Sequence, residues 1–128
     1  MNRVVHFEIP VDDMDAAKRF YGEVFGWGLQ AYGDGDDYLL AMTTEVGPDF
    51  RPTEPGAING ALMKRPGDAP APVLVMEVDS IDEHLGKVES AGGEVVRPKS
   101  EVPSMGYYAY VRDGQGNVIG LWETMAAS

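Results

Sequence analysis

The sequence predicts an α+β protein built from two copies of one βαβββ module, and three observations support this fold class. Short stretches alternate between apolar and polar residues, as strands do. Two longer stretches carry apolar residues at helical spacing, and each lies after one expected strand and before three more. Landmark residues of the two halves recur at a constant offset of 67 positions: Asp12 and Asp79, Asp13 and Ser80, and Gly26 and Gly93.

One such module leaves one face of its sheet bare. Two modules placed edge to edge can therefore curl into a cup, with the helices outside and a concave sheet face inside. We expect a single domain over residues 1–128, with a first module at about 1–65, a linker at 66–72 and a second module at about 73–128.

The first module should open with a strand at residues 4–11. His6 and Glu8 share one face of this strand, whereas the opposite face is wholly apolar and belongs to the core. A helix should follow, with Asp13 as its N-cap and Gly26 at its left-handed end. Its expected apolar stripe consists of Ala17, Phe20, Tyr21, Val24 and Phe25.

Three further strands complete the first module, at residues 27–32, 38–43 and 57–63. The segment 33–37 between the first two is rich in glycine and aspartate and predicts a turn. The segment 47–55 contains three prolines and must be an irregular loop. Phe50 in this loop could close over a ligand or anchor the loop, and we favour anchoring.

The second module repeats the pattern with a strand at 73–78 and a helix capped by Ser80, with Glu83 completing a capping box. Gly92 and Gly93 should end this helix, and a short strand is expected at 94–97. A hairpin follows, whose turn at 113–117 holds two glycines that can adopt positive φ.

This hairpin carries the aromatic side chains that suggest a ligand site. Tyr108 and Tyr110 share one face of the first strand, and Gly120 and Trp122 share one face of the second. These rings could equally stack on a planar molecule or form ordinary core, because the small Gly120 should leave space beside them that a pure core would fill.

Composition excludes several classes of function. The net charge of −11 disfavours nucleic-acid binding, because such a surface repels phosphate backbones. The absence of cysteine excludes disulfides and thiolate chemistry. No apolar run is long enough to span a membrane and no signal-peptide pattern opens the chain, so we expect a cytoplasmic protein with no membrane contact.

The organisation of the chain resembles the vicinal oxygen chelate superfamily, which includes glyoxalase I, extradiol dioxygenases and bleomycin-resistance proteins. The resemblance rests mainly on the segment from Val11 to Trp27, which reads VDDMDAAKRFYGEVFGW, and on the segment from Tyr108 to Glu123. It implies paired βαβββ modules and often a homodimer.

Metal-dependent members of this superfamily hold a divalent ion with side chains from four strands. The resemblance maps these positions onto His6, Gly60 or its neighbours, the region of Val73, and Gly120. Of these only His6 is a competent ligand, and a catalytic transition-metal site needs about three protein ligands. We therefore expect no metal and no other cofactor.

The sequence thus leads to a first hypothesis of a cup that binds a small organic molecule without a metal. Its candidate ligand-binding residues are Tyr108, Tyr110, Gly120, Trp122, Asn59 and Phe50. A second hypothesis is a glyoxalase-like lyase or isomerase with His6 as base and Glu8 beside it. A third is a dimeric interaction protein without a ligand. His6 could equally be a histidine hydrogen-bonded at the sheet surface.

Overall fold

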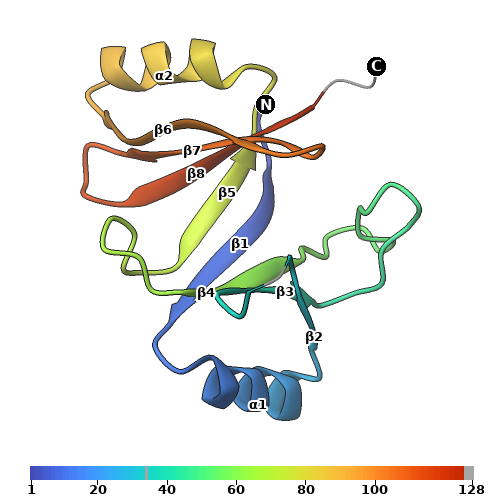
Figure 1. Cartoon of the computed structure of the whole chain (residues 1–128). Coiled ribbons are helices and arrows are strands. Elements are labelled where there is room, and N and C mark those ends of the chain that lie inside the picture. The colour runs from blue at the N-terminus through green and yellow to red at the C-terminus, as the bar shows by residue number, and fades with distance from the viewer. Residues whose placement is uncertain (34, 126–128) are drawn as a thin grey trace. The chain divides into compact units, whose positions relative to one another are not determined.

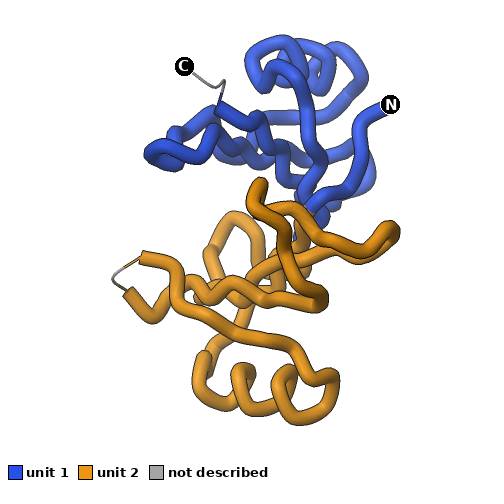
Figure 2. The backbone as a smooth tube through the Cα atoms, turned by 90° about the vertical axis from the view of Figure 1, so that its right-hand side faces the viewer, with its two compact units in different colours: residues 1–5, 73–128 blue, residues 6–72 orange. Residues whose placement is uncertain are grey.

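The computed structural model describes residues 1–33 and 35–125, which contain two helices and eight strands. Strand, helix and three strands follow one another twice along the chain (Figure 1). This order confirms the α+β class and the repeated βαβββ module. The chain divides into two compact units (Figure 2). The N-terminal unit holds residues 6–72, and the C-terminal unit holds residues 1–5 with the chain from residue 73 onward.

The N-terminal unit places one helix against a mixed sheet. Its elements are β1 (Val4–Val11) from His6 onward, α1 (Met14–Phe25), β2 (Gly28–Ala31), β3 (Tyr38–Met42) and β4 (Gly60–Lys64). The strands lie in the order β2-β3-β4-β1, in which β1 and β4 run parallel and the other pairs antiparallel. Val11, Leu39 and Leu62 form the buried core under the helix. The apolar face of β1 is therefore the core face, as predicted.

The ends of α1 confirm the predicted caps, but its apolar stripe is only partly buried. Asp13 Oδ1 accepts a hydrogen bond from the Ala16 amide at 3.0 Å, and Gly26 has φ of 71°. Ala17 and Tyr21 pack on the core. The expectation is wrong for the remaining three, because the helix turns Met14, Ala17 and Tyr21 toward the short strands. Those exposed residues are Phe20, Val24 and Phe25, at 53, 56 and 59%.

Two strand boundaries differ from the prediction. The strand expected at 57–63 begins only at Gly60. In the preceding residue, Asn59, the side-chain oxygen accepts hydrogen bonds from the backbone amides of Thr43 and Thr44. The strand expected at 94–97 continues to Val102, since β6 tolerates its proline at a sheet edge. The predicted turn 33–37 includes Asp34, which lies outside the described residues.

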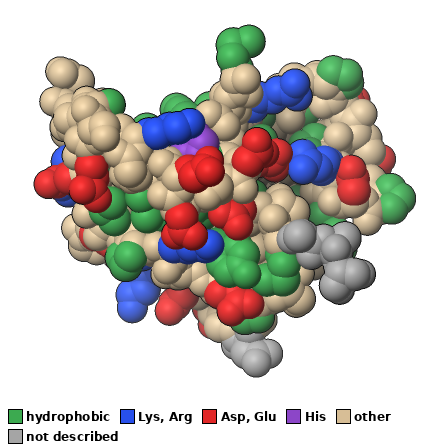
Figure 3. Space-filling view, turned by 90° about the horizontal axis from the view of Figure 1, so that it is seen from above, with side chains coloured by type: hydrophobic (Ala, Val, Ile, Leu, Met, Phe, Trp, Pro, Cys, Tyr) green, Lys and Arg blue, Asp and Glu red, His purple; other side chains and the backbone are tan. Residues whose placement is uncertain are grey.

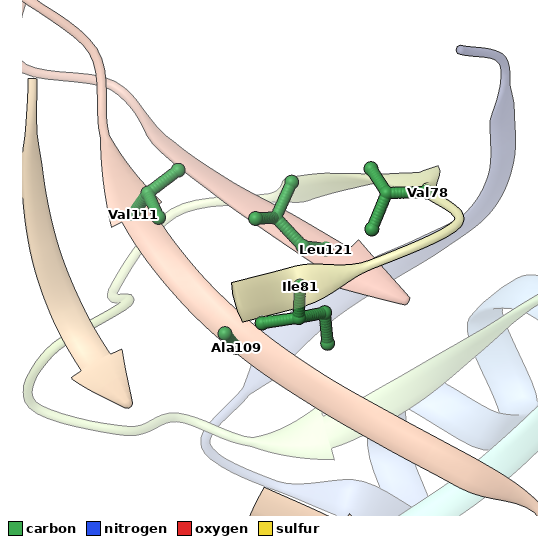
Figure 4. Close-up of a cluster of buried hydrophobic side chains, with 5 residues drawn as sticks. All are labelled: Val78, Ile81, Ala109, Val111 and Leu121. Carbon is green, nitrogen blue, oxygen red and sulfur yellow. The ribbon is translucent and has the colours of Figure 1, made fainter. Parts of the chain in front are cut away.

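The C-terminal unit repeats the architecture. Its elements are β5 (Val73–Glu77), α2 (Ile81–Ser90), β6 (Glu94–Val102), β7 (Gly106–Arg112) and β8 (Val118–Thr124), with strand order β5-β8-β7-β6. The helix covers one face of this sheet. The core between them is a cluster of five buried side chains drawn in Figure 4: Val78, Ile81, Ala109, Val111 and Leu121.

Helix α2 is fixed at both ends. Ser80 Oγ accepts from the Glu83 amide at 3.2 Å, which confirms the N-cap, and Glu123 Oε1 accepts from the Ile81 amide at 2.8 Å. Glu123 therefore lies on the helix side of the sheet. The residue with left-handed backbone after α2 is Gly92, with φ of 94°, so Gly92 rather than Gly93 plays the part of Gly26.

The predicted hairpin is formed by β7 and β8. Its turn is held by Asp113, whose carboxylate accepts hydrogen bonds from the amides of Gln115 and Asn117 at 2.7 and 2.9 Å. These bonds, those of Asn117 first, lower the pKa of Asp113. Gly116 takes the positive φ that the turn requires.

Acidic side chains are interspersed with basic ones on the face shown in Figure 3. No helix in the described part of the chain combines the length and the apolar character that a membrane span requires.

Candidate functional site

A chain of three hydrogen-bonded polar side chains lies on the helix-free face of the N-terminal sheet. His6 and Glu8 on β1 share that face, as predicted, and Tyr38 on β3 joins them. The Tyr38 hydroxyl lies 2.9 Å from His6 Nε2 and donates to Glu8 Oε2 at 2.9 Å. Glu8 is 8% exposed and is the one buried charged residue among those described. We name these three residues the His–Tyr–Glu relay.

The relay determines which nitrogen of His6 carries a proton. Tyr38 has a single hydroxyl proton and gives it to Glu8, so its oxygen can only accept from His6 Nε2–H. Burial lowers the pKa of His6, and the nearby Glu8 carboxylate offsets only part of this effect. The neutral ring is thus favoured, and its Nδ1 is left as a hydrogen-bond acceptor or a base.

Sequence reasoning did not find Tyr38 as a functional residue. Alternation places it opposite the core residue Leu39, and this was the available signal. Its approach to β1 depends on β4 between them: Tyr38 pairs with Met63, and Met63 pairs with Pro10. The order of these strands in the sheet could not be read from local pattern.

The helix-free face of the C-terminal sheet is aromatic. Tyr108 pairs with Trp122 and Tyr110 pairs with Gly120, so these four residues share a face as expected. The Tyr108 and Tyr110 rings meet edge to face at 6.0 Å between centroids. Arg97 on β6, which sequence reasoning missed, lies with its guanidinium carbon 4.4 Å from the Tyr110 ring centroid. We name this surface the tyrosine face.

Gly120 does not open the space that its size suggested. A β-carbon at this position would lie 2.9 Å from Val75 Cγ2 and 3.4 Å from Val73 Cγ1. Glycine therefore allows close packing of β8 against the side chains of β5, and the expectation of empty space at this position was wrong. The Trp122 indole N–H donates to Thr124 Oγ1 at 3.1 Å.

The other two candidate ligand-binding residues are Asn59, which bonds to backbone, and Phe50, which is exposed. The Asn59 amide accepts from the backbone of Thr43 and Thr44 and donates to Thr44 O at 3.3 Å, so it ties β4 to the end of β3. Phe50 is 77% exposed with φ of 61°. It does not anchor its loop, which is held instead by backbone hydrogen bonds such as Thr53 N–H to Glu45 O.

The donor set does not fit the ion of the metal-dependent proteins. Gly60 lies on the Phe7 side of the sheet, opposite His6, because a β-carbon there would lie 2.4 Å from Phe7 O and from the Phe7 ring. Its neighbour Ala61 pairs with Glu8 and has no donor atom, and Gly120 has none either. Within residues 1–33 and 35–125, no three His, Asp or Glu side chains converge on a point where an ion could bind. The expectation of a metal-free protein stays a prediction.

A surface hollow of the N-terminal unit lies elsewhere. It measures about 520 Å³ and is lined by residues including Asp12, Asp15, Lys18 and Leu39 at the start of α1. Leu39 belongs to the core under the helix, so this hollow opens on the side of the sheet opposite the His–Tyr–Glu relay. The hollow and the relay are therefore separate features.

Comparison with known proteins identifies the family. A family model described as the Glyoxalase/Bleomycin resistance protein/Dioxygenase superfamily matches residues 3–121. The chain belongs to this superfamily. It is 30% identical over 120 residues to "Putative glyoxylase CFP32" of Mycobacterium bovis and to the protein of the same name in Mycobacterium tuberculosis. The match covers 91% of this chain and 43% of each relative, so the chain spans less than half of their length.

Solved structures support the fold. Methylmalonyl-CoA epimerase from Mycobacterium tuberculosis aligns with a TM-score of 0.65 at 21% identity, covering 95% of this chain and 87% of the epimerase. A glyoxalase/bleomycin resistance protein/dioxygenase superfamily member from Vibrio splendidus 12B01 aligns with a TM-score of 0.64 at 14% identity, covering 98% and 100%. At these identities the likeness shows a shared fold only. The chemistry of this superfamily member must be argued from its own residues.

Proposed function

We propose that this superfamily member binds a small organic molecule on a helix-free sheet face, without a bound metal. The observation that carries this proposal is the His–Tyr–Glu relay. Burying the Glu8 carboxylate costs free energy, and the Tyr38 hydroxyl offsets this cost by donating a hydrogen bond to it. An apolar side chain at this position would fold without that cost, so the polar group indicates a function beyond packing. The relay leaves His6 Nδ1 ready to accept a hydrogen bond from a ligand.

The tyrosine face supports the same proposal from the other unit. Tyr108 and Trp122 are only half-buried, and they offer aromatic surface on which a planar molecule can stack. Binding sites for small molecules combine such apolar surface with a few well-positioned polar groups. On the tyrosine face Arg97 supplies a polar group of this kind.

The test is a screen of small organic molecules by thermal stabilisation and by quenching of Trp27 and Trp122 fluorescence. A ligand that binds the native state stabilises it in proportion to the logarithm of its concentration over its Kd. We expect aromatic compounds among the hits. A broad library in which no compound changes either the melting temperature or the fluorescence would contradict the proposal and favour a protein that acts through a protein partner.

A second candidate function is proton transfer, as in a lyase or isomerase with His6 as the base. It is favoured by the neutral His6 ring, whose Nδ1 is free of the Tyr38 hydrogen bond. The name of the mycobacterial relatives, and the epimerase activity named for one structural neighbour, agree with such chemistry. Replacement His6→Ala separates the two functions: turnover would vanish, whereas ligand affinity would fall by about tenfold or less, the value of one hydrogen bond.

We also retain the prediction of a homodimer in the cytoplasm. Sedimentation equilibrium of the purified protein tests the assembly, and a monomeric mass at all concentrations would contradict it. The proposed ligand binding does not depend on this result.

A further inference from the structure

The side chain of Arg97 is directed to the tyrosine face by irregularities in β6. Glu94 pairs with Arg112 and Val95 with Val111, and this register, continued without change, would set Arg97 opposite Ala109 on the face that α2 covers. A shift between Val95 and Arg97 sets Arg97 opposite Tyr110 instead. Bulges commonly re-aim side chains in this way near functional sites.

A second shift in the same direction follows, and it restores the original alternation of side chains between the two faces. Between Arg97 and Ser100 the register moves again, and Lys99 returns to the α2 side, where its Nζ lies 3.1 Å from Asp82 Oδ2 and 4.5 Å from the Tyr107 ring centroid. The two irregularities thus separate two cations that are neighbours in sequence. Lys99 forms an ion pair with Asp82 of α2, whereas Arg97 lies on the tyrosine face beside Tyr108 and Tyr110.

We infer that the tyrosine face binds a planar aromatic carboxylate, with Arg97 holding the carboxylate and Tyr108 and Trp122 packing on the ring. This inference rests on the proposed small-molecule function and specifies its ligand class. The Arg97 guanidinium carbon lies 4.4 Å from the centroid of the Tyr110 ring, which holds the cation on the tyrosine face. A guanidinium has enough donors to serve a ligand and a neighbour at once.

The geometry suits a flat acid of modest size. The Arg97 guanidinium carbon lies 5.9 Å from the centroid of the Tyr108 ring, which pairs across the sheet with Trp122. One rigid molecule can therefore reach the cation with its carboxylate and the rings with its apolar part. A single guanidinium matches the planar two-oxygen geometry of a carboxylate, and a monoanion is the charge that it can balance.

The probes are 1-naphthoate and its neutral analogue 1-naphthamide, titrated into the full chain by calorimetry. We expect naphthoate to bind roughly 10- to 100-fold more tightly, as a charge-assisted hydrogen-bonded pair provides. Arg97→Met should abolish this preference, and Arg97→Lys should retain part of it. The matched control is Arg112→Met, because Arg112 lies on the neighbouring strand with its guanidinium paired to Glu94. That variant should keep the full preference.

Indole resonances locate the site, because the chain has two tryptophans. Naphthoate should shift the indole N–H signal of Trp122 in ¹⁵N spectra more than that of Trp27. Equal affinity for the two probes, or a preference that survives Arg97→Met, would overturn the inference. Binding of the amide alone would overturn it while leaving the proposed function intact, and failure of both probes would overturn it and leave the proposed function to the library screen.

Discussion

His6 shows how one residue can be predicted in place and still depend on a neighbour that the sequence does not reveal. Its alternation with Val5 and Phe7 was enough to assign its face and to pair it with Glu8. The Tyr38 hydroxyl, which bridges the two at 2.9 Å on each side, comes from a residue 32 positions after His6. The chemistry of the imidazole follows from that bridge.

The lowered pKa of His6 predicts a dependence of stability on pH. The folded state disfavours the charged ring, so between the folded pKa and the ordinary value of about 6.5 the unfolded chain binds more protons. The contribution is therefore complete above about pH 6.5 and is lost as the pH falls through the window below it. Urea unfolding from pH 5 to pH 8 measures this slope.

Replacement His6→Gln should flatten the slope in that window. The matched control is His84→Gln, which removes the other histidine of the chain and should leave the slope in place. If the His6 variant kept the full pH dependence, the buried neutral ring would be the wrong description of this residue.

Replacement Tyr38→Phe tests the relay itself. It removes the hydroxyl from between His6 and the buried Glu8 carboxylate and should lower the free energy of unfolding by roughly 1–3 kcal/mol. Tyr32→Phe is the control, since Tyr32 lies beside Tyr38 but is 42% exposed, and it should change stability by less than about 0.5 kcal/mol. Equal effects of the two replacements in urea unfolding would argue against the relay.

Other single residues show where composition misleads. Asn59 had the polarity of a ligand-binding residue, yet both ends of its amide bond to the backbone of Thr43 and Thr44, just after β3. Gly120 had the size of a cavity residue, yet Val75 occupies the space beside it. Both errors have one cause: the partner belongs to a different strand, and strand neighbours are set by tertiary packing.

At the scale of elements, the helices were predictable because their signals are local. Asp13 and Ser80 cap as expected, since each accepts from an amide three residues on. The exposed part of the α1 stripe was not predictable, because burial of Phe20 and Phe25 depends on how wide a sheet lies beneath them. The bulges of β6 leave little trace in sequence beyond Pro98, and they decide where Arg97 and Lys99 point.

Glu123 gives α2 a second cap from a distant strand. Its carboxylate accepts from the Ile81 amide at the positive end of the helix dipole, so Glu123→Ala should reduce stability by about 1–2 kcal/mol. Glu123→Gln keeps an acceptor and should lose less. Glu101→Ala, at an exposed position of β6, is the control, and thermal unfolding that ranks it level with Glu123→Ala would refute the capping role.

Replacing a glycine should have opposite effects on stability in the C-terminal sheet and in helix α2. Gly120→Ala should destabilise by about 1–3 kcal/mol, because the new methyl group would overlap the Val75 side chain. Gly86→Ala, inside α2 with no heavy atom within 4 Å of the new β-carbon, should instead stabilise by about 0.5–1 kcal/mol. Denaturant unfolding of the two variants should give changes of opposite sign in the free energy of unfolding. If Gly120→Ala left this free energy unchanged, β5 and β8 would be less tightly packed than described.

At the scale of the molecule, the repeat was the most informative feature of the sequence. The start of α2 lies 67 positions after the start of α1, at Ile81 and Met14, which is the offset read from the caps. Each half repeats strand, helix and three strands although few residues are identical. The order survives because caps, turns and alternation are local signals that point to the same result. The ligand and the reaction carry no such signal.

The same repeat makes the metal question a property of the whole chain, because the superfamily's metal sites draw one ligand from each of four strands. Here two of those positions supply no donor atom: Ala61 is the residue of β4 that shares a face with Glu8, and β8 has Gly120 packed against Val75. We therefore expect the thermal unfolding curve to be unchanged by prolonged EDTA treatment and by later addition of Zn²⁺, Ni²⁺ or Mn²⁺. A resident ion at 1,000 times its Kd would contribute about 4 kcal/mol of stability, a difference that such a comparison would reveal at once. Elemental analysis of protein purified without chelator supplies the independent measurement, and one equivalent of a transition metal that EDTA removes with a drop in melting temperature would mean that other residues of the chain hold it.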